Sequence, residues 1–309
     1  MRKFFFKIYF VSIFIMIPLK VAYCEVFIVA KVNQEIITNI DLDFEKRYLI
    51  SLNPNLKKLD QNRIKEYAKN SLINEKIKKI EIEKRFEISP NETLLSKVIG
   101  DIYSSIGISS LSEFESYLSQ NKIDIKRVKE KISIEIAWND LIVKTFANEI
   151  EIDQNFLIKE IEKIGEKKID KLLISEIVFT INEKKELKTK YEEIKKSINE
   201  IGFEETARIY SLSDSKKSGG NLGWIYKNQL SKNVRERLNE IQIGGFTKPI
   251  VTGGGFLILK LNDLKTEDVK INKDDQLKKM IEFERERQFT RFSTLYYKRV
   301  FNNTEINEK

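Results

Sequence analysis

Glycine is concentrated in one part of this 309-residue chain: eight of its twelve glycines lie between Gly219 and Gly255. Glycine accepts backbone angles that clash with any side chain, so such a cluster predicts several tight turns close together. GGNLGW (219–224) predicts a turn leading into a strand, and GGG (253–255) predicts a hairpin turn before an apolar strand. LLISEIVF (172–179) predicts an earlier strand. The region therefore predicts short strands joined by glycine turns, with helical stretches between them.

The chain on either side of this region carries mainly helical patterns. VFIVAKVNQEIIT (26–38) predicts a strand pair, and apolar residues at helical spacing up to residue 165 predict a bundle of about five helices. A charged helix is predicted from about Asp274 to Val300, with an apolar stripe on one face. The stripe consists of Leu277, Ile281, Phe289, Phe292, Tyr296 and Val300. A lone helix cannot bury such a stripe, so it either packs on the N-terminal helices as core or offers a surface to other chains.

The charge distribution argues against nucleic acid as a partner. The formal net charge is +8 and the pI is about 9.1, but four positive charges lie in the first 24 residues and the rest of the chain carries +4. Lysine alternates with acidic residues, whereas a nucleic-acid surface needs clustered Lys and Arg. With no histidine and one cysteine, zinc sites and Ser-His-Asp arrangements are excluded. We expect no metal, no other cofactor and no nucleotide, since no lysine followed by Ser or Thr completes a phosphate loop.

Met1–Cys24 has the pattern of a secretory signal peptide. It has a basic start, an apolar run from Ile8 to Leu19, and small Ala22 shortly before a cut after Cys24. A membrane span needs roughly twenty apolar residues, so the short run favours export with cleavage. An uncleaved inner-membrane anchor is the alternative, since Phe4–Phe6 lengthens the run. Lipidation of Cys24 is disfavoured because a tyrosine precedes it where that motif needs a small residue.

The order of signals from residue 172 to residue 263 resembles the parvulin family of prolyl isomerases from end to end. The family's first strand is S-H-I-L-I-like and its last strand is G-[FY]-H-I-I-K-like. In this chain, the two histidine positions fall on Glu176 and Leu257. The third polar position of the family, a Cys or Asp, falls near Leu212, with Asp214 displaced from it by two residues. The resemblance therefore implies a parvulin scaffold whose usual polar centre is replaced, and no residue is assigned with confidence as catalytic.

The same resemblance implies a substrate-binding surface. The proline pocket of active members is lined by Phe, Met and Phe, and the matching positions are Ile225, Leu230 and Val234, with Trp224 and Phe256 as further binding residues. Family membership implies a peptidyl-prolyl cis-trans isomerase. The loss of both histidines argues against activity, because lowering the amide rotation barrier of about 18–20 kcal/mol requires a tight pocket and an organised polar centre.

The whole order of parts is similar to the SurA family of periplasmic chaperones, over roughly residues 25–302. AKVNQEIITNIDLD (30–43) resembles the family's opening V-V-N-x-E-x-I-x-x-x-D-x-D, and GGGFLILKLNDLK (253–265) resembles the close of its first parvulin domain. The resemblance implies an α+β protein, with a helical chaperone domain completed by a C-terminal helix and a parvulin-like domain built as a small antiparallel sheet surrounded by helices. We expect five units: signal peptide 1–24, helical domain 25–165, parvulin-like domain 166–264, docking C-terminal helix 265–302 and disordered tail 303–309.

The resemblance implies a periplasmic, ATP-independent holdase that assists folding and delivery of unfolded outer-membrane proteins and uses its parvulin domain mainly for binding. Implied partners are those unfolded proteins, aromatic-rich peptides and the outer-membrane assembly machinery. An active parvulin-type isomerase and a membrane-tethered periplasmic foldase are the alternatives.

Overall fold

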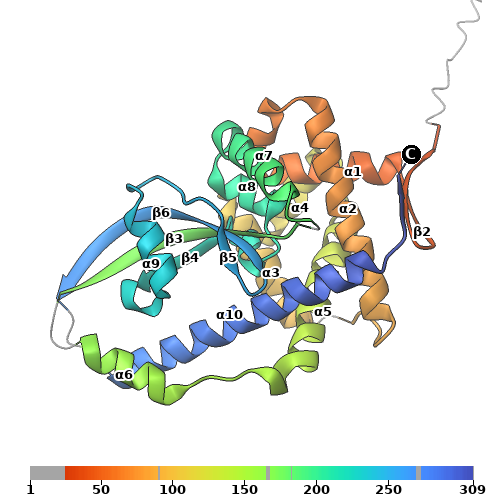
Figure 1. The fold of residues 1–309 in the computed structure, drawn as a ribbon. Helices are drawn as coiled ribbons and strands as arrows, with labels where there is room; N and C mark the ends of the chain where they lie inside the picture. The colour runs from red at the N-terminus through yellow and green to blue at the C-terminus, as the bar shows by residue number, and fades with distance from the viewer. Residues whose placement is uncertain (1–24, 90, 165–167, 182, 269–272, 309) are drawn as a thin grey trace, which may run out of the picture.

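A computed structural model of the protein describes five stretches of the chain, residues 25–89, 91–164, 168–181, 183–268 and 273–308. The predicted signal peptide lies outside them. Figure 1 shows a helical part and a sheet-containing part side by side, with the long helix α10 (Lys273–Asn302) running past both. The expected α+β architecture is confirmed, including the C-terminal helix that completes the helical part.

A three-stranded antiparallel sheet brings the two ends of the described chain together. Its strands are β1 (Ile28–Val32), β2 (Glu35–Thr38) and β7 (Ile306–Glu308), in the order β2-β1-β7. Strand β7 corrects the prediction of a disordered tail at 303–309, because Ile306 pairs with Val32. The physical reason is the outer edge of β1, whose backbone N–H and C=O groups require partners that β7 supplies.

The helical domain follows the first hairpin. Its elements are α1 (Asn39–Leu52), η1 (Pro54–Lys58), α2 (Gln61–Glu83), α3 (Glu92–Ser105), α4 (Leu111–Gln120), α5 (Ile125–Phe146), η2 (Ala147–Glu149) and α6 (Gln154–Ile164). Helix α1 begins in a capping box, in which the Thr38 hydroxyl accepts from the Asp41 N–H and the Asp41 carboxylate accepts from the Thr38 N–H. This cap fixes where the chain turns from the small sheet into the bundle.

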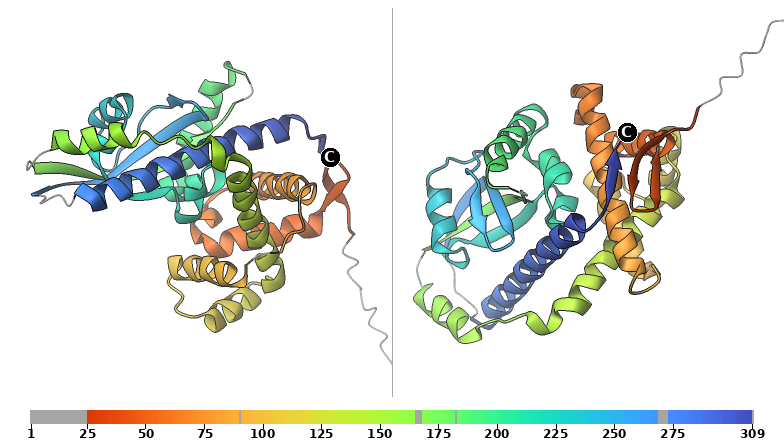
Figure 2. Two further views of the ribbon diagram at one scale, coloured as in Figure 1. Left: turned by 90° about the horizontal axis from the view of Figure 1, so that it is seen from below. Right: turned by 45° about the vertical axis from the view of Figure 1, so that its right-hand side comes forward.

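The C-terminal half of α10 belongs to the core of the helical domain. The Trp138 indole N–H of α5 donates to the Ser293 hydroxyl at 3.0 Å, and its ring centroid lies 5.6 Å from that of Tyr296. Phe146, also of α5, stacks on Phe292 at 4.8 Å. Of the two alternatives for the apolar stripe, core packing is thus confirmed for its C-terminal half. Figure 2 shows α10 crossing α5 on its way to the sheet-containing part.

A four-stranded antiparallel sheet organises the second domain, in the order β4-β3-β6-β5. The elements are β3 (Lys168–Phe179), α7 (Glu186–Ile201), α8 (Phe203–Tyr210), η3 (Asp214–Ser218), β4 (Asn221–Tyr226), η4 (Lys227–Gln229), α9 (Lys232–Asn239), β5 (Ile250–Thr252) and β6 (Gly255–Asp268). Helices α7 and α8 pack on one face of the sheet and α9 on the other. The glycine turns fall where the sequence predicted them. At the first turn, a Cβ on Gly220 would lie 2.2 Å from the Glu176 carbonyl oxygen.

The α7–α8 side of the sheet domain is packed on the helical domain. Ile201 at the end of α7 joins a buried cluster with Leu56, Leu59 and Ile64 of the helical domain. Tyr210 lies edge-on to Tyr67 at 5.6 Å between ring centroids, and their hydroxyls are 3.0 Å apart. The opposite face of the sheet, which carries α9, looks toward α10 (Figures 1 and 2).

Replacing Phe292 by alanine should destabilise the protein by about 2–3 kcal/mol, because the change removes the ring that stacks on Phe146 and leaves a gap in the core. Denaturant unfolding followed by circular dichroism measures this. Leu295→Ala on the same helix is the matched control and should cost less than about 1 kcal/mol, since Leu295 is 40% exposed. Equal losses for the two variants would contradict the packing described for α10.

Candidate functional site

The candidate site lies on the face of the four-stranded sheet that α9 covers. In the β3–β6 pairing, Glu176 lies opposite Leu259, and Val178 lies opposite Leu257. Because side chains alternate along a strand, Glu176, Leu257 and Leu259 point to the same face. The two positions that match the parvulin histidines are therefore neighbours on one face, and one of them carries a carboxyl group where the other carries only hydrocarbon.

An apolar cluster fills the rest of this face, and we call it the α9 cluster. Its buried members are Leu172, Ile174, Ile225, Leu230, Leu238, Ile250, Leu259 and Leu261, and Leu222, Val234, Ile241 and Leu257 pack against them partly buried. The predicted pocket residues Ile225, Leu230 and Val234 are thus brought together. The Ser231 hydroxyl caps α9 by accepting from the Val234 N–H, and the Arg235 guanidinium donates to the Leu230 carbonyl at 2.6 Å. These bonds hold α9 over the sheet.

The Glu176 carboxyl group is held by two serine hydroxyls. Ser213 donates to Glu176 Oε1 at 2.5 Å and Ser215 donates to the same oxygen at 2.8 Å. Both serines come from the turn around η3, which follows α8. The backbone N–H of Glu176 donates to the Gly220 carbonyl at 2.8 Å, so the glycine turn fixes the strand beside the carboxyl group.

Burial raises the pKa of Glu176 above that of an ordinary glutamate. The hydroxyls of Ser213 and Ser215 oppose this rise because they stabilise the carboxylate, whereas the negative charge of Asp214 adds to it. The group can therefore bind a proton more readily than a solvent-exposed carboxylate. Leu257, which replaces the second histidine, supplies no polar atom to share that proton. The site is a single carboxyl group with two hydroxyls, beside an apolar surface.

The third predicted polar position is corrected by the structure. Leu212 donates its backbone N–H to the Val178 carbonyl at 2.7 Å, and its side chain packs against the core of the helical domain instead of lying beside Glu176. Ser213 and Ser215 take that place, and the sequence reasoning missed them. The signal was present in the run SLSDS (211–215), where hydroxyls recur at alternate positions and can point together toward a neighbouring strand.

Two further predicted binding residues lie away from the α9 cluster. Trp224 neighbours Ile225 in strand β4, so the two side chains point to opposite faces of the sheet. The Lys265 ammonium lies over the Trp224 ring at 4.4 Å from the centroid. Phe256 stacks on Phe179 at 5.5 Å within the α7–α8 core. The structure therefore joins Ile225, Leu230 and Val234 in one apolar cluster and separates Trp224 and Phe256 from it.

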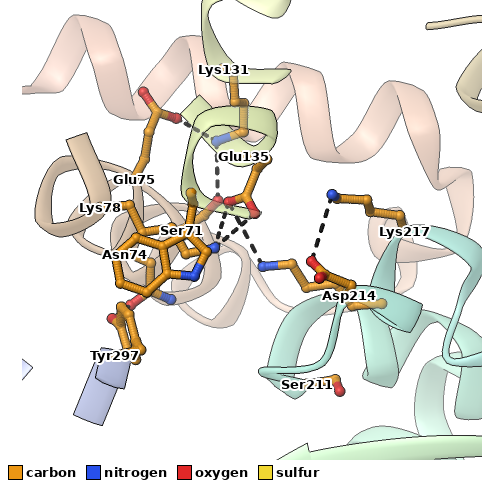
Figure 3. A network of polar contacts seen from close by, with 12 residues as sticks. Ser71, Asn74, Glu75, Lys78, Lys131, Glu135, Ser211, Asp214, Lys217 and Tyr297 are labelled. Carbon is orange, nitrogen blue, oxygen red and sulfur yellow. Dashed lines mark hydrogen bonds and ion pairs between the residues drawn. The ribbon is translucent and has the colours of Figure 1, made fainter. Parts of the chain in front are cut away.

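A network of charged residues joins the η3 turn to the helical domain, as Figure 3 shows. The Glu135 carboxylate of α5 lies 2.7 Å from the Lys78 ammonium of α2 and 3.9 Å from the Lys216 ammonium of η3. Burial alone would raise the pKa of Glu135, but the charges of Lys216 and Lys78 hold it well below the usual range. Glu135 is thus an anion between the two domains. Its partner Lys216 directly follows Ser215, one of the two serines that hold Glu176.

A second lysine extends the network within the helical domain. The Lys131 ammonium lies 2.6 Å from Glu75 and 3.1 Å from Glu45. Burial would lower the pKa of Lys131, but these two carboxylates raise it, so the lysine stays charged. The network gives the η3 turn a fixed electrostatic partner on the helical domain, which positions Ser213 and Ser215 indirectly.

Comparison with known proteins agrees with this geometry. Residues 172–263 match the rotamase family model, described as the PPIC-type PPIASE domain. The sheet domain therefore matches the model of a PpiC-type domain. Its resemblance extends to Periplasmic chaperone PpiD of Haemophilus influenzae, which is 32% identical over 98 residues, 30% of this chain and 15% of that protein.

Over about two thirds of its length the chain is similar to SurA chaperones. Chaperone SurA of Pseudomonas aeruginosa is 24% identical over 234 residues, 69% of this chain and 54% of the relative, and Chaperone SurA of Pseudomonas putida is 22% identical over 211 residues, 63% and 48%. The chain spans about half the length of these curated relatives. A solved structure of a SurA-like chaperone from Campylobacter jejuni matches 91% of this chain and 98% of its own at 16% identity, with a TM-score of 0.36.

Replacing Glu176 by glutamine should change how stability depends on pH. Because the folded-state pKa of Glu176 is raised, the wild type is favoured below the unfolded-state pKa and loses this advantage as pH rises through the folded-state value. The unfolding free energy of wild type minus that of Glu176→Gln should therefore fall as the pH rises above about 4, the ordinary pKa of a glutamate. Denaturant unfolding at several pH values measures it. Glu236→Gln, on the exposed surface of α9, is the control, and a difference that rises with pH for Glu176→Gln would contradict the burial described.

Proposed function

We propose that the protein is a periplasmic, ATP-independent holdase for unfolded outer-membrane proteins, and that its PpiC-type domain binds peptide without appreciable isomerisation. One observation carries the proposal: the apolar α9 cluster is retained, whereas the polar centre beside it contains Glu176 and Leu257 in place of two histidines. The surface needed to hold a peptide is separate from the groups needed to turn its amide bond.

A holdase needs only moderate affinity for its client, because it must also release it. Apolar burial contributes about 25 cal/mol per Å², so a few side chains of an extended client on Ile225, Leu230 and Val234 would bind it weakly. Weak contacts at several places together bind a long client, and each contact can dissociate without nucleotide, so the client is released. The homology to Chaperone SurA supports the chaperone class, and transfer of clients to the outer-membrane assembly machinery is the proposed next step.

An active isomerase is the second candidate, and one observation favours it. Glu176 with Ser213 and Ser215 forms a polar centre at the place where the active family has its own, and its raised pKa would let it donate a proton to a twisted amide. A membrane-tethered foldase is the third candidate and depends on residues 1–24, outside the described part. Among the described residues, no helix is both long and apolar enough to cross a membrane.

The purified protein should delay aggregation of an unfolded outer-membrane barrel protein while accelerating isomerisation of a proline-containing tetrapeptide little above background. Light scattering and a protease-coupled peptide assay on the same sample measure both. Glu176→His with Leu257→His should restore little activity, because Ile225 and Val234 still lack the aromatic walls of an active pocket. A wild-type rate typical of active parvulins, abolished by Glu176→Ala, would contradict the proposal and favour the enzyme.

The binding surface itself is tested by a matched pair of charged variants. Val234→Asp places a carboxylate in the α9 cluster and should weaken the delay of aggregation, because a desolvated charge opposes binding of an apolar side chain. Val251→Asp makes the same change on strand β5 at a side chain that is 73% exposed, and should leave the delay unchanged. Equal effects of the two substitutions would place the client elsewhere.

A further inference from the structure

Helix α10 places an aromatic side chain of its own against the proposed peptide surface. Phe283 packs against the α9 cluster, the same cluster that contains Ile225, Leu230 and Val234. It lies in the N-terminal half of α10, which runs past the α9 side of the sheet (Figure 2). An aromatic ring in this position covers apolar surface that an incoming client would otherwise cover.

The two halves of α10 are anchored differently. The C-terminal half lies in the helical core through Phe292, Tyr296 and Tyr297. The N-terminal half packs on α6, where Met280 joins a small cluster with Leu157 and Ile161. Figure 1 shows α6 and this end of α10 lying together beyond the helical bundle. The end that carries Phe283 can therefore separate from the sheet domain with α6, while the aromatic seam with α5 stays intact.

Two side chains, one in the sheet domain and one in α10, are buried with polar atoms that have no partner among the described residues. Both amide atoms of Asn228 in η4, which contacts α6, and Nε2 of Gln276 in α10 have no hydrogen-bond partner among the described residues. Gln276 is only 6% exposed. Such groups regain hydrogen bonds to water when an interface opens. The structure thus combines a favourable apolar contact at Phe283 with unpartnered polar atoms at Asn228 and Gln276.

We propose that Phe283 is an internal occupant of the peptide surface, which competes with an apolar or aromatic side chain of the client. This inference rests on the proposed function, because it concerns the same surface. When Phe283 is in place, the surface is covered and only the fraction of molecules with the arm displaced accepts a client. The apparent dissociation constant is then the intrinsic constant divided by that open fraction. The device keeps an apolar surface shielded until a client competes for it.

The first test measures binding of a fluorescein-labelled peptide of alternating Phe and Ser with one Pro, by fluorescence anisotropy. If the closed form holds about nine molecules in ten, Phe283→Ala should bind this peptide about tenfold more tightly than wild type. Leu295→Ala, which shortens an apolar side chain of the same helix outside the α9 cluster, should bind it like wild type. Unchanged or weaker binding by Phe283→Ala, with a folded protein by circular dichroism, would overturn the proposal.

A second variant keeps the covering ring and reports its position. Phe283→Trp, made together with Trp224→Phe, places an indole at the surface, with buried Trp138 as the remaining one. The emission maximum of this indole should lie at short wavelength in the free protein. It should shift to longer wavelength as the same peptide saturates the protein, because the indole is expelled into water. Saturation without any spectral change would overturn the proposal, since the peptide would then bind without displacing residue 283.

The holdase proposal and the covering role of Phe283 can fail separately. If wild type binds the peptide and delays aggregation but Phe283→Ala does so equally, the covering role of Phe283 is wrong and the holdase proposal stands. If neither wild type nor any variant binds the peptide or delays aggregation, the holdase proposal is wrong and the competition proposal falls with it.

Discussion

The contact between α5 and α10 is the interaction on which the rest of the structure depends. Trp138 and Phe146 hold Tyr296 and Phe292 in the helical core, although the hydrogen-bonded residues Trp138 and Ser293 are 155 positions apart in the sequence. Closing so long a loop costs conformational entropy, and the burial of several aromatic rings offsets it. Once this seam forms, the other end of α10 lies beside the sheet domain, and β7 reaches β1.

The site combines two physical environments that rarely share a surface. A carboxyl group with a raised pKa lies at one end, satisfied by two hydroxyls, and an apolar cluster held under α9 lies beside it. The apolar part can bind a side chain by excluding water. The polar part has one titrating group where an isomerase of this class has a pair of imidazoles. This difference is why the geometry favours holding a peptide over turning its amide bond.

Much of the fold could be predicted from local patterns. The glycine turns, the two sheet strands around them and the apolar stripe of α10 follow from short-range chemistry, and the structure has all three. The face of the sheet to which each side chain points is harder to predict from the sequence. Trp224 and Phe256 are predicted as binding residues, yet alternation along a strand places their side chains on the face opposite to that of Ile225 and Leu257.

The remaining features required tertiary contacts that the sequence does not reveal. Ser213 and Ser215 became site residues because η3 folds back on β3, and the ordered tail depends on the free edge of β1. Phe283 lies on the predicted helix but outside its predicted stripe, and helical periodicity cannot reveal that a second domain lies against it. Such contacts arise only when distant segments meet in space.

The central claim is that client peptides bind on the α9 face of the sheet, and methyl NMR spectroscopy tests it directly. With labelled Ile, Leu and Val methyl groups, the account predicts that a proline-containing apolar peptide shifts the signals of Ile225, Leu230 and Val234. Signals of Ile194 and Ile198, which lie in the core on the other face of the sheet, should stay in place. Shifts confined to the helical domain, or larger at Ile194 and Ile198 than in the α9 cluster, would contradict the account.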